Sequence, residues 1–185
     1  VRFFGDTLYL VTFETVDPLY VINVTNPEDP MIAGELTIPG FSDFLHPVND
    51  DLLLGLGADE NGLTKLELFN ISDMTAPYSL GTHILGDGSW SHSEARYNRH
   101  AFTYQQYDES TDRFAVPLTV YGADEDDYYQ QNRLYMLQLE GKDNPAVTTI
   151  VEVGYLKSVT DNWWNNGPHR SVFDDDAVYF IDGTS

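Results

Sequence analysis

Three residues that lie far apart in the sequence, His46, Glu94 and His169, have side chains of the types that bind metal ions. Imidazole and carboxylate groups together suit zinc, manganese or nickel. Their spacing follows no compact metal motif, so a divalent metal site would require a fold that brings all three together. The alternative interpretation is structural, because buried polar groups normally have partners. In that case His46 caps a turn, and Glu94 pairs with Arg96 or Arg99.

Two adjacent tryptophans, Trp163 and Trp164, are a second candidate site. They are followed by two asparagines, a glycine and a proline, a composition typical of a loop. Large rigid rings with an N–H donor stack on sugar rings or anchor a protein partner. The pair is therefore a candidate ligand-binding site for a glycan or a protein. Alternatively, both rings pack between structural units.

Other chemistry has weaker support in the sequence. Residues 59–62 (DENG) lack the alternating carboxylates and the closing glutamate of a calcium loop, so a hairpin turn explains them more simply. The acidic run at 124–127 could attract a cation. Ser91 and Ser93 lie near His92, but neighbours on a strand alternate faces and do not form a catalytic triad.

A repeated unit must position these side chains. Three times, a proline follows the last apolar residue of a strand by six positions: Val24 to Pro30, Ile71 to Pro77 and Leu139 to Pro145. An acidic turn followed by an apolar run recurs as well, and its first two copies, at Asp6 and Asp50, are 44 residues apart. A period in the mid-forties with about four short strands per unit is typical of a β-propeller blade.

The predicted fold is all-β, made of β-propeller blades with four antiparallel strands each. The units lie near residues 1–37, 38–86 and 87–154, and residues 155–185 begin a fourth. Closed propellers usually have about four to eight blades. We therefore expect an incomplete propeller, whose remaining blades come from the rest of a longer chain or from another chain.

The third unit is longer than the others. Pro77 and Pro145 are 68 residues apart, and the surplus is assigned to an acidic insertion near residues 105–131, where carboxylates interrupt the strand pattern. Insertions in repeat proteins collect in loops, often on the binding face. The alternative is a solvated loop without a partner.

The innermost strand of each propeller blade lines a central channel, where residues distant in sequence converge. Alternation and turn residues predict such strands near Arg2–Phe4, Phe44–His46, Glu94–Tyr97 and Arg170–Phe173. This arrangement would place His46, Glu94 and His169 on or beside the channel, which is the basis of the metal-site prediction.

Composition excludes several classes of function. Nine Lys and Arg residues against thirty Asp and Glu give a net charge of −21. A chain with this much negative charge repels phosphate groups. Nucleic acid and anionic membranes are therefore not expected as partners. The chain has no cysteine, which excludes disulfides and cysteine nucleophiles. No stretch approaches the roughly 18 apolar residues of a membrane span.

Two longer runs carry a family resemblance, residues 11–24 (VTFETVDPLYVINV) and 34–47 (GELTIPGFSDFLHP). With Ser93–Tyr97 and His100–Phe102, they resemble the secreted β-propeller C-terminal domain family of bacteria and archaea. The resemblance covers most of the chain and is most specific in the first hundred residues. It implies an exported propeller, distantly related to WD-repeat domains, at the cell surface, in the periplasm or outside the cell. It implies no reaction.

The sequence therefore favours a non-catalytic, exported binding module for a protein, glycan or cation. It is not expected to be an enzyme or to need a cofactor beyond a divalent metal. The alternative is a metal-dependent hydrolase or lyase that uses His46, Glu94 and His169 in the channel.

Overall fold

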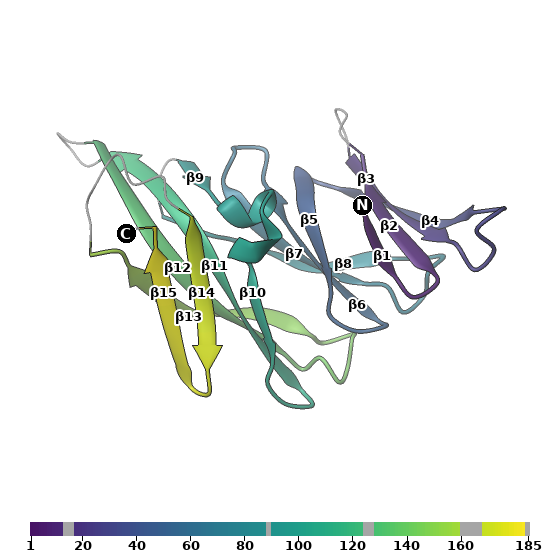
Figure 1. Cartoon of the computed structure of the whole chain (residues 1–185). Helices are drawn as coiled ribbons and strands as arrows, with labels where there is room; N and C mark the ends of the chain where they lie inside the picture. The colour runs from purple at the N-terminus through teal and green to yellow at the C-terminus, as the bar shows by residue number, and fades with distance from the viewer. Residues whose placement is uncertain (13–16, 88–89, 124–127, 160–167, 184–185) are drawn as a thin grey trace.

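A computed structural model describes residues 1–12, 17–87, 90–123, 128–159 and 168–183 of the chain. They form antiparallel sheets that follow one another along the sequence (Figure 1). The first sheet contains β1 (Arg2–Phe4), β2 (Thr7–Val11), β3 (Asp17–Asn23) and β4 (Met31–Ile38). The second contains β5 (Phe41–Pro47), β6 (Leu52–Ala58), β7 (Thr64–Asn70) and β8 (Tyr78–Ile84).

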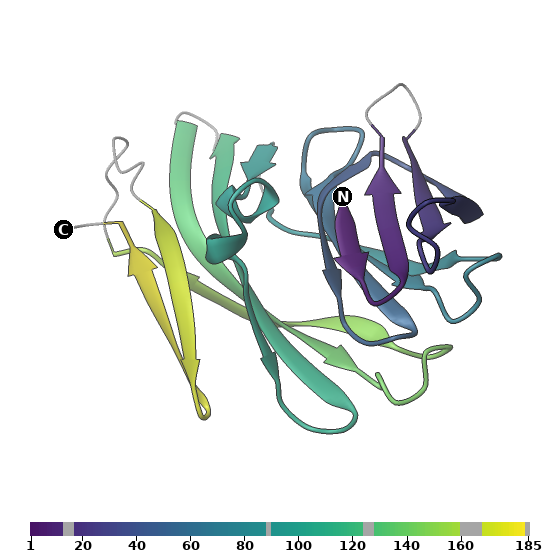
Figure 2. The same ribbon diagram turned by 45° about the vertical axis from the view of Figure 1, so that its right-hand side comes forward.

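The third sheet has five strands, and a fourth sheet is a hairpin. The third contains β9 (Trp90–His92), β10 (Thr103–Gln106), β11 (Thr111–Ala123), β12 (Tyr128–Glu140) and β13 (Thr149–Lys157). The hairpin is β14 (His169–Asp174) with β15 (Ala177–Asp182). The described sheets form an open fan from the first sheet to this hairpin (Figures 1 and 2). The all-β fold of four-stranded antiparallel blades in an incomplete propeller is thereby confirmed.

The predicted acidic turns join the first and second strands of their sheets. Gly5 (φ 54°) lies between β1 and β2, and Asp175 (φ 50°) lies between β14 and β15. Both have left-handed backbone, which glycine and aspartate tolerate better than most residues. The turn predicted at 59–62 is also present between β6 and β7, where the Asp59 side chain accepts hydrogen bonds from the amides of Asn61 (2.9 Å) and Leu63 (2.8 Å).

The outermost strand of each four-strand path carries a β-bulge just before a glycine. Register shifts place one extra residue of the outer strand before Gly34 in β4, Gly81 in β8 and Gly154 in β13. Gly81 and Gly154 have φ values of 153° and 147°, which few other residues adopt. The same local device therefore recurs in three sheets.

Two apolar clusters lie between successive sheets. The first sheet packs on the second through residues such as Leu19, Val21, Leu53 and Phe69. The second packs on the third through Leu54, Leu66, Phe114 and Leu137, among others. Every residue of β6 and β7 in the second sheet is buried, because this sheet packs against another sheet on each of its faces.

The contact between the third sheet and the β14–β15 hairpin includes several polar interactions. The Thr103 hydroxyl donates to the Ser171 carbonyl (2.9 Å), and Arg113 Nη1 lies 3.0 Å from Asp176 Oδ1. Asn132 Nδ2 donates to Asp182 Oδ1 at 3.4 Å. Hydrogen bonds thus connect this hairpin to the third sheet.

The acidic insertion expected at residues 105–131 is mostly strand rather than loop. β11 and β12 contain 13 residues each and pair along their whole length. Within this region Asp112 is fully buried and accepts hydrogen bonds from Lys142 Nζ and the Tyr104 hydroxyl, each at 2.5 Å. The expectation was wrong because apolar alternation continues beyond the carboxylates: Phe114, Val116, Leu118 and Val120 are all buried. Residues 124–127 lie outside the described part of the chain.

Candidate functional site

The innermost strand of the third sheet is interrupted. β9 and β10 both pair with β11, with His92 opposite Thr119 and Thr103 opposite Ala115. Ten residues, Ser93–Phe102, therefore lie opposite only three residues of β11. We call Ser93–Phe102 the inner-strand excursion. It contains two short 3-10 helices, η1 (Glu94–Arg96) and η2 (Arg99–Ala101), so the predicted inner strand at Glu94–Tyr97 is wrong.

Local sequence explains why the excursion leaves the sheet. The Ser93 side chain accepts a hydrogen bond from the Ala95 amide, and that of Asn98 accepts one from the His100 amide. Serine and asparagine favour helix starts through such bonds. Ala95 and Ala101 are fully buried and pack in the core between the second and third sheets. Each 3-10 helix is thus capped by a polar side chain and anchored by a small apolar one.

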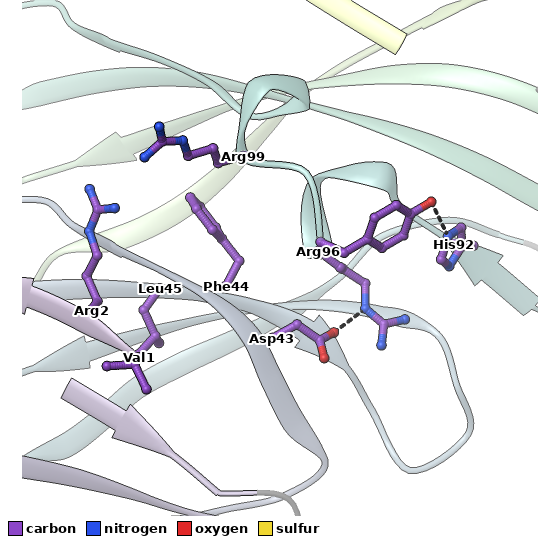
Figure 3. Close-up of a pocket in the computed structure, with 9 residues that line it drawn as sticks. Val1, Arg2, Asp43, Phe44, Leu45, His92, Arg96 and Arg99 are labelled. Carbon is purple, nitrogen blue, oxygen red and sulfur yellow. Dashed lines mark hydrogen bonds and ion pairs between the residues drawn. The ribbon is translucent and has the colours of Figure 1, made fainter. Parts of the chain in front are cut away.

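The excursion contributes to two cavities of about 540 Å³ each. The first lies toward β1 and β5, and its lining includes Arg2, Asp43, Phe44, Arg96, Tyr97 and Arg99 (Figure 3). The second lies toward β11 and β14, and its lining includes Glu94, Tyr97, Thr119, Tyr121 and His169. His92 and Tyr97 line both. The two cavities therefore meet at this pair of rings.

Glu94 links the excursion to β14. Its carboxylate accepts hydrogen bonds from the His169 amide (2.8 Å), Arg170 Nη1 (2.9 Å) and Asn98 Nδ2 (2.6 Å). Burial opposes ionisation, but these hydrogen bonds and the charge of Arg170 outweigh it and hold the pKa of Glu94 below its usual value. Its ionic partner is Arg170, so the expected pairing with Arg96 or Arg99 is wrong.

Two of the three predicted metal ligands come together. His169 Nδ1 lies 3.7 Å from Glu94 Oε2, and His169 Nε2 lies 3.0 Å from Asp182 Oδ1. Even so, the residues covered by the structure contain no group of three or more His, Asp or Glu side chains that could hold a metal ion. The three-residue metal site has no support from this geometry.

The third predicted ligand, His46, makes its contacts elsewhere. It lies within β5 and packs in an aromatic cluster, with ring centroids 4.2 Å from Tyr104 and 5.2 Å from Phe102. Burial, followed by the positive charge of Arg2, lowers the pKa of His46 to about 4. His46 is a strand residue with a packed ring, so its expected role in capping a turn is also wrong.

A row of aromatic rings leads out of the cavities. Trp90 and His92 have nearly parallel rings with centroids 5.7 Å apart, and Tyr97 stacks on His92 at 5.4 Å. The Tyr97 hydroxyl lies 3.1 Å from His92 Nε2. Burial, then the charge of Arg96, lowers the pKa of His92. The outer members stay accessible, because Trp90 is 42% and Tyr97 72% exposed.

Sequence reasoning missed Arg2, Asp43, Tyr97 and Arg99. For Tyr97 and Arg99, which lie in the excursion, the sequence does contain a signal. Ser93 and Asn98 are capping residues, and each is followed two or three positions later by an alanine, which is a pattern of short helical turns rather than of a strand. The predicted tryptophan pair, Trp163 and Trp164, lies outside the described residues and stays a prediction.

These sheets agree with the comparison to known families. The sequence matches the family described as "Beta propeller domain" over residues 1–185, so the chain belongs to this family. Within the part of the chain that the structure covers, no helix has the length and apolar character needed to cross a membrane.

Two archaeal proteins are similar to part of the chain. One is "Uncharacterized protein MJ1554" of Methanocaldococcus jannaschii, 43% identical over 106 residues, which are 57% of this chain and 17% of that protein. The other is an uncharacterized protein of Archaeoglobus fulgidus, 48% identical over 102 residues, which are 55% of this chain and 16% of that protein. The matched region is therefore about a sixth of each relative.

Proposed function

We propose that this chain is part of an exported β-propeller that acts as a non-catalytic binding module, with its ligand at the inner-strand excursion. The observation that carries the proposal is the meeting of two cavities at His92 and Tyr97. Each is about 540 Å³, within the roughly 300–1,000 Å³ of small-ligand sites. The resemblance of the sequence to a secreted propeller family supports the placement outside the cytoplasm.

A glycan suits this surface better than a protein. Exposed aromatic rings, such as Trp90 and Tyr97, present flat apolar faces on which a sugar ring stacks, and their N–H and O–H groups serve its hydroxyls. A protein partner typically needs about 800 Å² on each side, whereas the features gathered here are two cavities and a short row of rings. We therefore propose an oligosaccharide that lies along the rings with one unit in a cavity.

The polar groups at the site favour binding over catalysis. Glu94 is held ionised by three hydrogen bonds to neighbouring groups, whereas a general acid needs a pKa near the working pH. The ring of His92 is engaged with the Tyr97 hydroxyl. Both side chains thus serve the architecture of the site.

Oligosaccharide arrays followed by calorimetry on the full chain test this function. Tyr97→Ala should weaken binding about tenfold or more, as expected for a central aromatic contact. Tyr78→Ala is the matched control, because Tyr78 is an exposed tyrosine on β8 that lines neither cavity. Unchanged binding by Tyr97→Ala would remove this surface from consideration. Cleavage of the oligosaccharide during incubation would contradict a non-catalytic role.

A further inference from the structure

Most positive charges of this acidic protein are neutralised by carboxylates. Six of the nine Lys and Arg side chains form ion pairs with Asp or Glu: Lys65, Arg96, Arg113, Arg133, Lys142 and Arg170. Lys157 lies over the Tyr155 ring. Among the described residues, neither Arg2 nor Arg99 has an ion-pair partner. With thirty acidic residues against nine basic ones, two unpaired arginines in one place are unexpected.

These two arginines line the same cavity. Arg2 belongs to β1 and Arg99 to η2, and both contribute to the first cavity. Figure 3 shows both guanidinium groups on the same side of the Phe44 ring. The third arginine, Arg96, extends instead to Asp43, with 2.5 Å between Arg96 Nε and Asp43 Oδ2.

The local charge is opposite in sign to that of the molecule. Side chains in the cavity supply three positive charges, from Arg2, Arg96 and Arg99, and one negative charge, from Asp43. The cavity thus has a net of two positive charges in a chain of net charge −21. Such a site attracts an anion locally while the rest of the surface repels it.

We propose that the first cavity binds the carboxylate of an acidic sugar residue, a uronic acid, between Arg2 and Arg99. This inference rests on the proposed glycan-binding function and specifies its substrate class. Planar guanidinium groups bind carboxylates through paired N–H···O bonds. Phe44 and Tyr97, which line the same cavity, offer apolar surface to the sugar ring.

A carboxylate fits this cavity better than a phosphate. A phosphate monoester has nearly twice the negative charge at neutral pH, so the arginines attract it more strongly, but the rest of the acidic protein and the nearby Asp43 carboxylate also repel it more strongly. A uronic acid carries one negative charge, which two unpaired arginines satisfy.

Calorimetry with the full chain and two probes of equal length, a galacturonic acid trimer and a neutral galactose trimer, tests the inference. The acidic trimer should bind about tenfold or more tightly, and more weakly as salt increases. Arg2→Gln and Arg99→Gln should each reduce its affinity about tenfold to a hundredfold. Arg99→Lys keeps the charge without the planar fork and should lose less. Lys157→Gln is the charge-matched control outside the cavity and should bind like the unaltered protein.

The outcomes separate this inference from the proposed function. If both trimers bind equally and binding still requires Tyr97, the glycan-binding function stands and the uronic acid inference is overturned. Two competition results would also overturn the inference. In the first, inorganic phosphate binds through Arg99 more tightly than glucuronate does. In the second, an oligoglutamate peptide displaces the acidic trimer more effectively than free galacturonate does. If no sugar binds in a Tyr97-dependent manner, the proposed function fails as well.

Discussion

Protonation of His46 should destabilise the folded chain in mildly acidic solution. Burial, reinforced by the charge of Arg2 and opposed by Asp112, lowers the pKa of His46 from 6.5 to about 4. The unfolded chain therefore takes up a proton near pH 6.5, and the folded chain does so only near pH 4. The favourable contribution of neutral His46 is fully present above pH 6.5 and is lost as the pH falls to about 4. A shift of this size corresponds to about 3 kcal/mol, or about 2–3 kcal/mol after allowing for partial solvent screening.

Urea denaturation of the full chain between pH 7 and pH 4 measures this loss. His46→Phe retains an aromatic ring between Phe102 and Tyr104 but cannot take up a proton. As the pH falls from 7 to 4, the free energy of unfolding should decrease more in the unaltered protein than in His46→Phe. The difference between the two decreases should be about 2–3 kcal/mol. His100→Gln, at an exposed histidine, is the matched control for the loss of an imidazole. An unchanged slope in His46→Phe, or a His46 proton resonance that titrates near pH 6.5, would refute the reasoning.

Two further substitutions test packing. Asp112→Ala removes the fully buried partner of Lys142 and should cost about 3–5 kcal/mol. Glu109→Gln, at an exposed residue of the same hairpin, should change the free energy of unfolding measured in urea by less than about 0.5 kcal/mol. Equal effects of the two substitutions would contradict the buried role of Asp112. Gly57→Ala would place a methyl group 1.8 Å from the Phe41 carbonyl oxygen, so thermal unfolding should report a loss of about 1–3 kcal/mol. A neutral result there would mean that β5 moves away readily.

Local signals predicted the fold well, because each blade repeats the same short-range chemistry. The acidic turns before apolar runs are hairpins, as Gly5 and Asp175 illustrate. The acidic insertion was misjudged because sequence gives the charge of a residue such as Asp112 but not the partners that allow its burial. Lys142 is thirty positions away in the chain and meets Asp112 only after the hairpin has folded.

The site was harder to predict than the sheets. Glu94 and His169 were identified as neighbours, but the strand expected around Glu94 is an excursion from the sheet. Alternation over four residues does not distinguish a short strand from a capped 3-10 turn. Arg2 and Arg99 could not be singled out, because their common cavity depends on how two sheets pack. An unpaired charge becomes visible only when the partners of all the other charges are known.

The bulges before Gly34, Gly81 and Gly154 also bear on whether the outer edges of these sheets can add a further strand. β4, β8 and β13 each hydrogen-bond to one neighbouring strand among the described residues, so each has an unpaired edge that could add a strand from another molecule. A bulge bends its strand and increases the local twist, which makes that edge a poor template for a straight incoming strand. Because the same bulge occurs in all three outer strands, the shape of each of these edges disfavours sheet extension.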